Sequence, residues 1–304
     1  DCVIYTTAIS DDNPELAAAR ASGAVVLHRA EILAAIVSGY PRAVAVTGTH
    51  GKSTTTALLG TILEAAGLDP LVIVGGDVPM WHGNVRFGEG DWCVFEACES
   101  DGTLLLYENC SQILTSLEPD HLDQHKSFEN LREMIRRFVA SGDPGGFLVY
   151  YADGEAARDV ATACPAPTFG FGFELGDYRV ADWEALGEQG SRYKLVGPAG
   201  VTPVVTSAWG KHNALNAAAA VAAAAVAGVR EDLSARVLAD FPGVGRRMEC
   251  LGLLGSSLIM DDYAHHPTEV RATLEAARLH LCRPILAIFQ PHLPSRTAHF
   301  MDAF

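Results

Sequence analysis

The chain has 304 residues, an apolar content of 49% and a formal net charge of −15 at pH 7. This length and apolar content allow two domains, or parts of three, with full hydrophobic cores, and they exclude a disordered chain. The negative charge argues against nucleic acid and anionic membranes as partners, because both surfaces would repel a chain without a basic patch.

Short apolar, often β-branched runs alternate with helical stretches over the first half of the chain. We predict strands at residues 2–7, 24–27 and 43–47, with helices at residues 14–21 and 30–38. The alternation continues with strands near residues 71–74, 92–97, 112–117 and 147–151, and helices at residues 53–66 and 128–141. This order predicts βαβ units, and so an α/β fold whose parallel sheet carries helices on both faces.

The sequence pattern changes in the second half of the chain. Gly-rich turns and short alternating segments at residues 168–206 predict an antiparallel flap, which we expect to form an edge subdomain. An alanine-rich helix at 214–227 and a helix at 232–239 precede FPGVGRR, whose glycines predict a connector and a domain boundary near residues 241–247. A strand at 258–262, a helix after Pro267 and a strand at 285–289 then open a second α/β unit.

The stretch VTGTHGKSTTT, residues 46–56, lies between a predicted strand and a predicted helix. Gly48 and Gly51 would let backbone N–H groups approach a phosphate, and the helix N-terminus adds positive potential. Lys52 would neutralise phosphate charge, and the Ser53 hydroxyl would bind Mg²⁺. The loop is shorter than the common triphosphate-binding loop. A structural alternative is a turn capped by Ser53, but the Gly-Lys-Ser triplet favours nucleotide binding.

Acidic side chains follow two later strands. FEACESD ends a strand with Glu96 and Glu99, and SLEPDHLD ends another with Asp120, His121 and Asp123. Taken alone, each cluster is more typical of a solvated loop or a helix cap than of a metal site. Downstream of a phosphate loop, at strand ends that face the ligand crevice, they favour Mg²⁺ binding.

Two asparagines open the alanine-rich helix. GKHNALNAAAA places Asn213 and Asn216 three residues apart. Either could cap the helix, and taken alone this is the favoured interpretation. Their amides also offer the donor and acceptor pair that recognises an adenine edge.

The order of GTHGKS, EACESD, EPDHLD, GKHNALNA, GVGRRME, DDYAHHPTEV and QPHLPSR resembles the Mur ligase family over nearly the whole chain. The last two motifs resemble its L-alanine-adding branch. The resemblance implies a three-domain architecture with a central P-loop ATPase sheet flanked by partial Rossmann-like domains. Residues 1–40 would end the UDP-sugar-binding domain, 41–245 would form the ATP-binding domain, and 246–304 would begin the amino-acid-binding domain.

The resemblance also implies a reaction and its participants. ATP, with Mg²⁺, would drive ligation of L-alanine to the lactyl carboxylate of UDP-N-acetylmuramate through an acyl phosphate, a step of peptidoglycan synthesis. Catalytic roles would fall to Lys52, Glu96, His121 and His265, and metal binding to Ser53, Glu96 and His121. The nucleotide would contact Gly48, Thr49, His50, Gly51, Lys52, Ser53, Thr54, Asn213, Asn216, Arg247 (or Arg246) and Asp262. The other substrates would contact His50, Tyr263, His265 and Arg296.

Several positions depart from the family pattern. Cys98 replaces an expected aspartate and Ser116 an asparagine, both beside the expected metal site, and Leu293 stands where many relatives carry a second arginine. The helix at residues 128–141 has no lysine, which agrees with the L-alanine branch and disagrees with branches that use a carbamylated lysine. Residues 75–90 match the pattern poorly.

Two other functions compete with this interpretation. One is a related ligase that recycles a whole peptide onto the same sugar nucleotide, and the other is a P-loop ATPase or kinase that forms no amide, including a nucleotide-binding remnant. Glu96, His121 and DDYAHHP favour ligation.

The composition also bears on location. Seven scattered cysteines without a Cys-x-x-Cys pair, no signal peptide, and an apolar run at 214–227 too short to cross a bilayer predict a cytoplasmic protein. We expect a monomer or weak homodimer. Because the sequence opens inside an apolar run and stops just after a predicted strand, we expect further residues at both ends.

Overall fold

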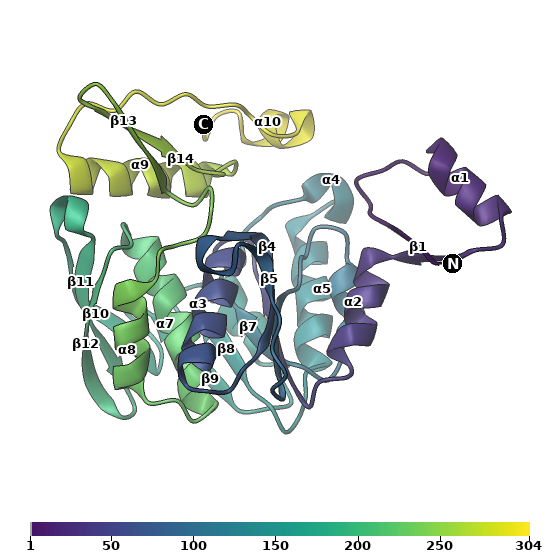
Figure 1. Ribbon diagram of the computed structural model, residues 1–304, viewed down its shortest axis with the longest axis horizontal. Coiled ribbons are helices and arrows are strands. Elements are labelled where there is room, and N and C mark those ends of the chain that lie inside the picture. The colour runs from purple at the N-terminus through teal and green to yellow at the C-terminus, as the bar shows by residue number, and fades with distance from the viewer. Residues whose placement is uncertain (1) are drawn as a thin grey trace.

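A ten-stranded sheet organises the middle of the chain in the computed structural model, which describes residues 2–304 (Figure 1). Its order is β12-β11-β10-β9-β8-β7-β3-β6-β4-β5. The parallel strands are β3 (Arg42–Thr47), β4 (Leu71–Val78), β6 (Trp92–Glu96), β7 (Ser111–Leu114), β8 (Leu148–Tyr151) and β9 (Thr168–Gly172). The phosphate-loop strand β3 lies between β6 and β7, so the ends of these three strands meet at one edge.

Helices cover both faces of this sheet, and each face has its own hydrophobic core. The first face packs on α3 (Lys52–Ala65), α7 (Lys211–Val226) and α8 (Glu231–Asp240). The second packs on α2 (Arg29–Val37), α5 (Phe128–Ala140) and α6 (Glu155–Ala161). Along β3, Val44 and Val46 point to the first core and Ala43 and Ala45 to the second, which explains why the strand is apolar at successive positions.

Two helices show how the sequence specifies these faces. In α5 the buried residues Leu131, Ile135, Phe138 and Val139 recur at helical spacing, and Ser127 caps the helix by accepting from the Asn130 N–H at 3.2 Å. In α7 the alanines are buried along most of the helix, because small side chains let α7 pack closely against α3 and the sheet.

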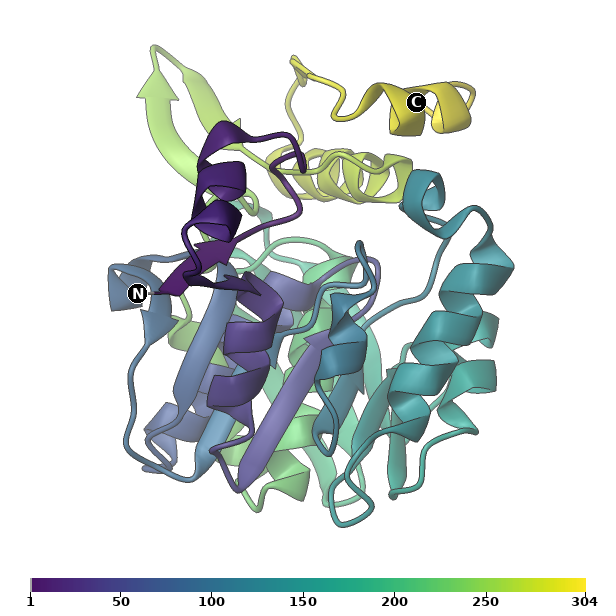
Figure 2. The ribbon, with the colours of Figure 1, turned by 90° about the vertical axis from the view of Figure 1, so that its right-hand side faces the viewer.

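Two smaller units flank the central one. The N-terminal unit, with β1 (Cys2–Tyr5), α1 (Pro14–Ala21) and β2 (Val25–His28), is a parallel two-stranded sheet that projects from the main body (Figure 1). The C-terminal unit contains β13 (Glu249–Leu254), β14 (Ser257–Asp261), α9 (Pro267–Leu281) and α10 (Pro294–Phe300). Figure 2 shows α9 and α10 lying across the end of the central unit toward which β3 runs.

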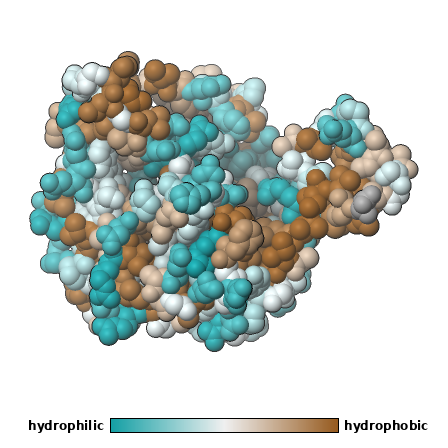
Figure 3. Space-filling model, in the orientation of Figure 1, coloured by the Kyte–Doolittle hydropathy of each residue, from teal (hydrophilic) through white to brown (hydrophobic). Residues whose placement is uncertain are grey.

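The surface of the C-terminal unit carries an apolar patch at the upper left of Figure 3. Its hairpin of β13 and β14 exposes Leu251, Leu253 and Leu254.

The remaining elements lie at the ends of the sheet. β5 (Gly83–Arg86) pairs antiparallel with β4 and falls in the segment that matches the family pattern poorly. At the other edge, β10 (Tyr178–Ala185), β11 (Ser191–Gly197) and β12 (Gly200–Thr206) are joined as antiparallel neighbours. α4 (Leu122–His125) is a single turn, and short 3₁₀ turns lie at Pro79–Trp81, Thr103–Leu106 and Gly187–Gln189.

The structure corrects two expectations. Residues 168–206 are not a separate subdomain: β9 pairs parallel with β8 after the crossover helix α6, which the sequence analysis missed, and β10 continues the same sheet. Residues 285–289 form no strand, because β13 and β14 pair only with each other and no strand lies beside this segment in the described chain. Leu286 and Ile288 are instead 89% and 95% exposed.

Among residues 2–304, no helix combines the length and the apolar character that crossing a bilayer would require.

Candidate functional site

The loop between β3 and α3 has the backbone geometry of a phosphate-binding loop. Gly48 and Gly51 have φ values of 125° and 82°, which disfavour other residues, and a Cβ atom would overlap Thr115 and Ser116 at Gly48 or Asn216 at Gly51. Gly51 is the N-cap of α3, and no side chain caps the helix. The alternative in which Ser53 caps the helix is therefore wrong, and the first N–H groups of α3 are available to an anion.

Lys52 folds back over this loop. Its Nζ donates to the carbonyl oxygen of Thr49 at 3.2 Å and to that of Gly48, and lies 3.0 Å from Oε2 of Glu99. Burial lowers the pKa of Lys52, but the charge and hydrogen bond of Glu99, together with nearby Cys98 and Glu96, outweigh burial and raise it overall. Glu99 is itself 1% exposed, so the pair is ionic and buried. A phosphate at the loop would compete with Glu99 for the ammonium group.

Three predicted metal ligands lie around the same strand ends. Ser53 is buried in the first turn of α3, and Glu96 ends β6 directly beside Val46 of β3. The Glu96 carboxylate accepts a hydrogen bond from the Gly75 N–H of β4. Burial lowers the pKa of His121, which keeps its imidazole neutral as metal ligation requires. The Ser53 hydroxyl and the Glu96 carboxylate are the hard oxygen donors that Mg²⁺ prefers, so these two residues fit this ion better than the imidazole of His121 does.

A cavity of about 250 Å³ opens above the loop, between the central and C-terminal units. It is lined by predicted nucleotide contacts from both units. From the central unit these are His50, Gly51, Lys52, Ser53, Thr54, Asn213 and Asn216, and from the C-terminal unit Arg247 and Asp262. Gly48 and Thr49 form the start of the same loop.

The asparagines on this cavity do not cap α7. The N-cap is Gly210, without a side-chain cap, whereas the Asn213 amide donates to the Trp209 carbonyl at 2.9 Å. Asn216 donates to Oδ1 of Asn213 at 3.2 Å. The capping interpretation is therefore wrong, and the hydrogen bond between the amides holds both of them at the cavity.

Asp262 and Arg247 approach the cavity from the C-terminal unit. The Asp262 carboxylate accepts the N–H groups of Met248 and Ala264, each at 2.7 Å, and burial raises its pKa. The guanidinium of Arg247 lies 5.4 Å from the ring centre of Tyr263. Arg246 stacks on the same ring but pairs with Asp261 at 3.1 Å, and only Arg247 lines the cavity.

The predicted amino-acid contacts form a second group. The ring centre of His265 lies 5.0 Å from that of Tyr263 and 5.8 Å from that of His292, and Nδ1 of His292 is 3.3 Å from the Arg296 guanidinium. Arg296 is 6% exposed and forms two hydrogen bonds with Asp120, at 3.0 and 3.2 Å. Arg296 is therefore not a surface arginine. A cavity of about 260 Å³ is lined by Asp120, His121, Arg296 and neighbours.

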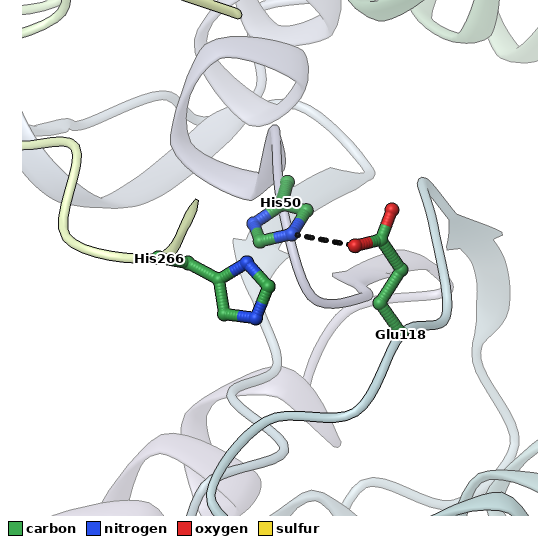
Figure 4. Close-up of side chains that lie close together, drawn as sticks. All are labelled: His50, Glu118 and His266. Carbon is green, nitrogen blue, oxygen red and sulfur yellow. Dashed lines mark ion pairs between the residues drawn. The ribbon is translucent and has the colours of Figure 1, made fainter. Parts of the chain in front are cut away.

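His50 lines this cavity, but both of its ring nitrogens lie near carboxylates. Its Nδ1 is 3.0 Å from Oε1 of Glu269. Its Nε2 is 3.5 Å from Oε2 of Glu118, the ion pair marked in Figure 4. Burial would lower the pKa of His50, but its hydrogen bonds and charge interactions with Glu118 and Glu269 raise it to about 9.

The sequence analysis did not single out Glu118, Glu269, His266 or His292. Glu269 could have been found, because His266 and Glu269 form a capping box at the start of α9 in HHPTE, with Pro267 at the first helical position. Glu118 contacts His50 and Thr268, and His292 contacts His265, so these contacts join parts of the chain far apart in sequence and no local pattern predicts them. Of the departures from the family pattern, Ser116 supports the loop, because its Oγ accepts the His50 N–H at 2.9 Å.

Three models of known protein families match consecutive parts of the chain. Residues 1–41 match the Mur ligase family, catalytic domain; residues 46–224 match the Mur ligase middle domain; and residues 246–304 match the Mur ligase, glutamate ligase domain.

One similar curated protein is the UDP-N-acetylmuramate–L-alanine ligase of Symbiobacterium thermophilum. It is 40% identical over 311 residues, which cover 100% of this chain and 64% of the relative. The chain thus spans less than two thirds of that protein's length.

Two solved structures are similar in fold. The UDP-N-acetylmuramate-alanine ligase MurC of Thermotoga maritima has a TM-score of 0.85 and 28% identity, with 99% of this chain and 69% of that chain covered. A murein peptide ligase of Psychrobacter arcticus has a TM-score of 0.75 and 26% identity, with 91% and 63% covered. These matches confirm the fold class and the family resemblance expected from the sequence. The chain belongs to the Mur ligase family.

Proposed function

We propose that this chain carries the ATP-binding centre of a ligase that joins L-alanine to the lactyl carboxylate of UDP-N-acetylmuramate. One observation carries the proposal. A single cavity combines a phosphate loop with two asparagines of α7 and with Arg247 and Asp262 of the C-terminal unit. The 40% identity to a UDP-N-acetylmuramate–L-alanine ligase supports this choice of substrates.

The nucleotide would lie along this cavity. The N–H groups at the start of α3 and the ammonium of Lys52 would bind the β- and γ-phosphates. Asn213 and Asn216 would recognise adenine, Asp262 the ribose, and Arg247 the phosphates. Ser53 and Glu96 would hold one Mg²⁺, and His121 would contribute to a second. When bound, Mg²⁺ supplies positive charge next to the transferring phosphoryl group.

In the reaction, a lactyl carboxylate oxygen attacks the γ-phosphorus, ADP leaves, and an acyl phosphate forms. The L-alanine amine then attacks the acyl carbon, an amide bond forms, and phosphate leaves. Lys52 would stabilise the negative charge of the phosphoryl group during its transfer, and Arg296 would bind the amino-acid carboxylate. His265, whose pKa is lowered by burial, is the neutral base beside this group that could take up the amine proton.

Several finer statements belong to the same proposal. We place the limits of the three domains at residues 1–40, 41–245 and 246–304. We also propose a cytoplasmic location and a monomer or weak homodimer, which fits an enzyme acting on soluble nucleotides.

Product formation tests the proposal. The protein is incubated with ATP, Mg²⁺, UDP-N-acetylmuramate and, in separate reactions, each amino acid or a short peptide, and the sugar nucleotide is weighed by mass spectrometry. We expect the mass of the sugar nucleotide to increase only in the reaction that contains L-alanine. A gain only with the peptide would identify the peptide-recycling ligase, and ATP hydrolysis without any amide would identify a P-loop ATPase.

A further inference from the structure

The central and C-terminal units are joined by polar contacts gathered at the start of α9. His50 of the phosphate loop pairs with Glu269 at 3.0 Å. Glu118, in the loop after β7, accepts the Thr268 hydroxyl at 2.7 Å. The ring centres of His50 and His266 lie 4.8 Å apart. These side chains come from the phosphate loop, the loop after β7 and the start of α9.

The electrostatics make the His50 contact an ion pair at neutral pH. The side chains of His50 and Glu269 are each 16% exposed. Burial would raise the pKa of Glu269, but the hydrogen bond and charge of His50 reverse this and lower it strongly. At neutral pH, His50 is therefore a positively charged imidazolium. It lies between two carboxylates, Glu118 of the central unit and Glu269 of the C-terminal unit. The titratable neighbours of the pair are His265, 3.6 Å from Glu269, and His266, which both precede α9, and His212 of α7.

The backbone of His50 links this pair to the nucleotide loop. Its N–H donates to Ser116 at 2.9 Å, and its carbonyl oxygen accepts the Thr115 hydroxyl. Gly51 and Lys52 follow directly in the chain. The imidazole is therefore attached to a hydrogen-bonded backbone segment that continues directly into the residues facing the cavity.

The same side chains do not favour a metal site. Ligand atoms of His50, Glu118 and His266 lie within 4.8 Å of one another. However, Nδ1 of His266 accepts the Thr268 N–H and Nε2 is 3.2 Å from the Pro119 carbonyl oxygen, so both ring nitrogens are engaged. Only His50 and Glu118 could then bind an ion, and two ligands are fewer than a stable protein site uses.

We propose that the His50–Glu269 ion pair is a positioning device that holds the C-terminal unit closed over the nucleotide, so that His50 acts through the geometry of the site and does not bind substrate. This inference rests on the proposed function, because it assigns a role in assembling the ATP cavity. The cavity needs both units: it is lined by Lys52 and Asn216 on one side and by Arg247, Asp262 and Thr273 on the other. Loss of the ion pair would favour an open arrangement, in which Arg247, Asp262 and Thr273 lie farther from the phosphate loop.

A double-mutant cycle on ATP affinity tests the proposal. His50→Gln, Glu269→Gln and the double variant are compared with the parent by isothermal titration with an unhydrolysable ATP analogue. Glu269→Gln is well suited, because the amide oxygen can still accept the N–H groups of His265 and His266 that cap α9 while the charge is lost. We expect each single change to weaken binding about tenfold, and the double variant to bind no worse than either single variant.

The surface pair Lys194–Asp182 provides a matched control. Its separation is 2.7 Å, but its side chains are 54% and 68% exposed and lie within one hairpin. Lys194→Gln and Asp182→Asn should leave ATP affinity unchanged and uncoupled.

Other outcomes would overturn the proposal. If His50 bound the sugar nucleotide, His50→Gln would raise the KM for UDP-N-acetylmuramate alone, and Glu269→Gln would leave ATP affinity unchanged. If the cluster were a metal site, Zn²⁺ alone would raise the Tm of the parent but not of His50→Gln. Independent, additive effects of the two changes would also contradict it. Ligation is measured separately, so coupled ATP binding in a protein that makes no amide would support the ion pair and refute the proposed function.

Discussion

At the scale of single residues, Lys52 and Glu99 show how a site residue can also be a stability residue. Lys52 neutralises a carboxylate that is 1% exposed, and Glu99 has no other charged partner in the described chain. The motif predicts the lysine and its proximity to phosphate. It does not predict that Glu99 holds the ammonium in the absence of phosphate, because that contact crosses from α3 to the loop after β6.

Replacing Lys52 should therefore affect both folding and chemistry. Lys52→Ala leaves the buried Glu99 charge unpaired, which costs about 3–5 kcal/mol of folding free energy. It also removes transition-state charge stabilisation, worth about two decades in kcat. Lys52→Met combined with Glu99→Gln should recover most of the stability in urea denaturation, but not the activity. Recovery of near-parental kcat in that double variant would show that Lys52 does not act on phosphate.

Arg296 raises a related question of competition. The guanidinium of Arg296 is bound to the carboxylate of Asp120 in a buried ion pair. An amino-acid carboxylate must therefore displace Asp120 or bind the guanidinium together with it. We expect Arg296→Lys to raise the KM for L-alanine at least tenfold and to change the KM for ATP little, because lysine keeps the charge but loses the bidentate geometry. Steady-state kinetics with each substrate varied in turn will check this. Equal shifts in both KM values would mean that Arg296 supports the fold around Asp120 and does not recognise the amino acid.

His50 gives stability a defined pH dependence. Its pKa is raised from 6.5 to about 9 in the folded chain, so its contribution is complete below about pH 6.5 and is lost as the pH rises through 9. This contribution is on the order of 3 kcal/mol. The lowered pKa of Glu269 acts in the opposite direction, and its contribution is lost only in acid, below its ordinary value of 4.5.

Thermal melts of the parent and of His50→Gln across pH 5–10 measure this effect. The difference in Tm between the two proteins should be largest near pH 6 and should shrink toward pH 10. A difference independent of pH would mean that the imidazole contributes by packing and not by charge.

At the scale of elements, the period of apolar residues predicts most helices and strands of the central unit to within a few residues. This pattern fails where pairing with other strands, or the length of an element, determines the structure. Residues 285–289 are apolar enough for a strand but have no neighbour to pair with, and α6 is too short for its pattern to stand out. The antiparallel character of β10 to β12 is predicted, whereas their continuity with the central sheet depends on long-range pairing of β8 with β9.

Gly60 tests packing between α3 and β4. An added Cβ atom would lie 2.6 Å from Cγ2 and 2.8 Å from Cγ1 of Val72, which is fully buried. Alanine favours a helix by about 1 kcal/mol over glycine, but overpacking costs about 1–3 kcal/mol. We therefore expect Gly60→Ala to lower the free energy of unfolding, measured in urea. Val72→Ala, combined with it, should cost less than the sum of the two single changes, and a stabilising Gly60→Ala would refute the close approach.

At the scale of the whole molecule, the ordered motifs of the sequence predict a shared site, and the fold brings several of them to one cavity. The phosphate loop, the α7 asparagines, Arg247 and Asp262 come from segments roughly two hundred residues apart, and they meet because α9 lies across the strand ends. What the motifs could not predict is the set of contacts that joins the units, since His50–Glu269 and Asp120–Arg296 depend on how the units are placed relative to each other.

We propose that ATP activates the lactyl carboxylate as an acyl phosphate, and the fate of a carboxylate oxygen reports on this step. UDP-N-acetylmuramate labelled with ¹⁸O in its lactyl carboxylate is incubated with the protein, ATP, Mg²⁺ and L-alanine, and the released phosphate is analysed by mass spectrometry. The oxygen that attacks phosphorus leaves with the phosphate when the amine displaces it. We predict one ¹⁸O atom in each phosphate released with the amide product, and unlabelled phosphate would contradict the account.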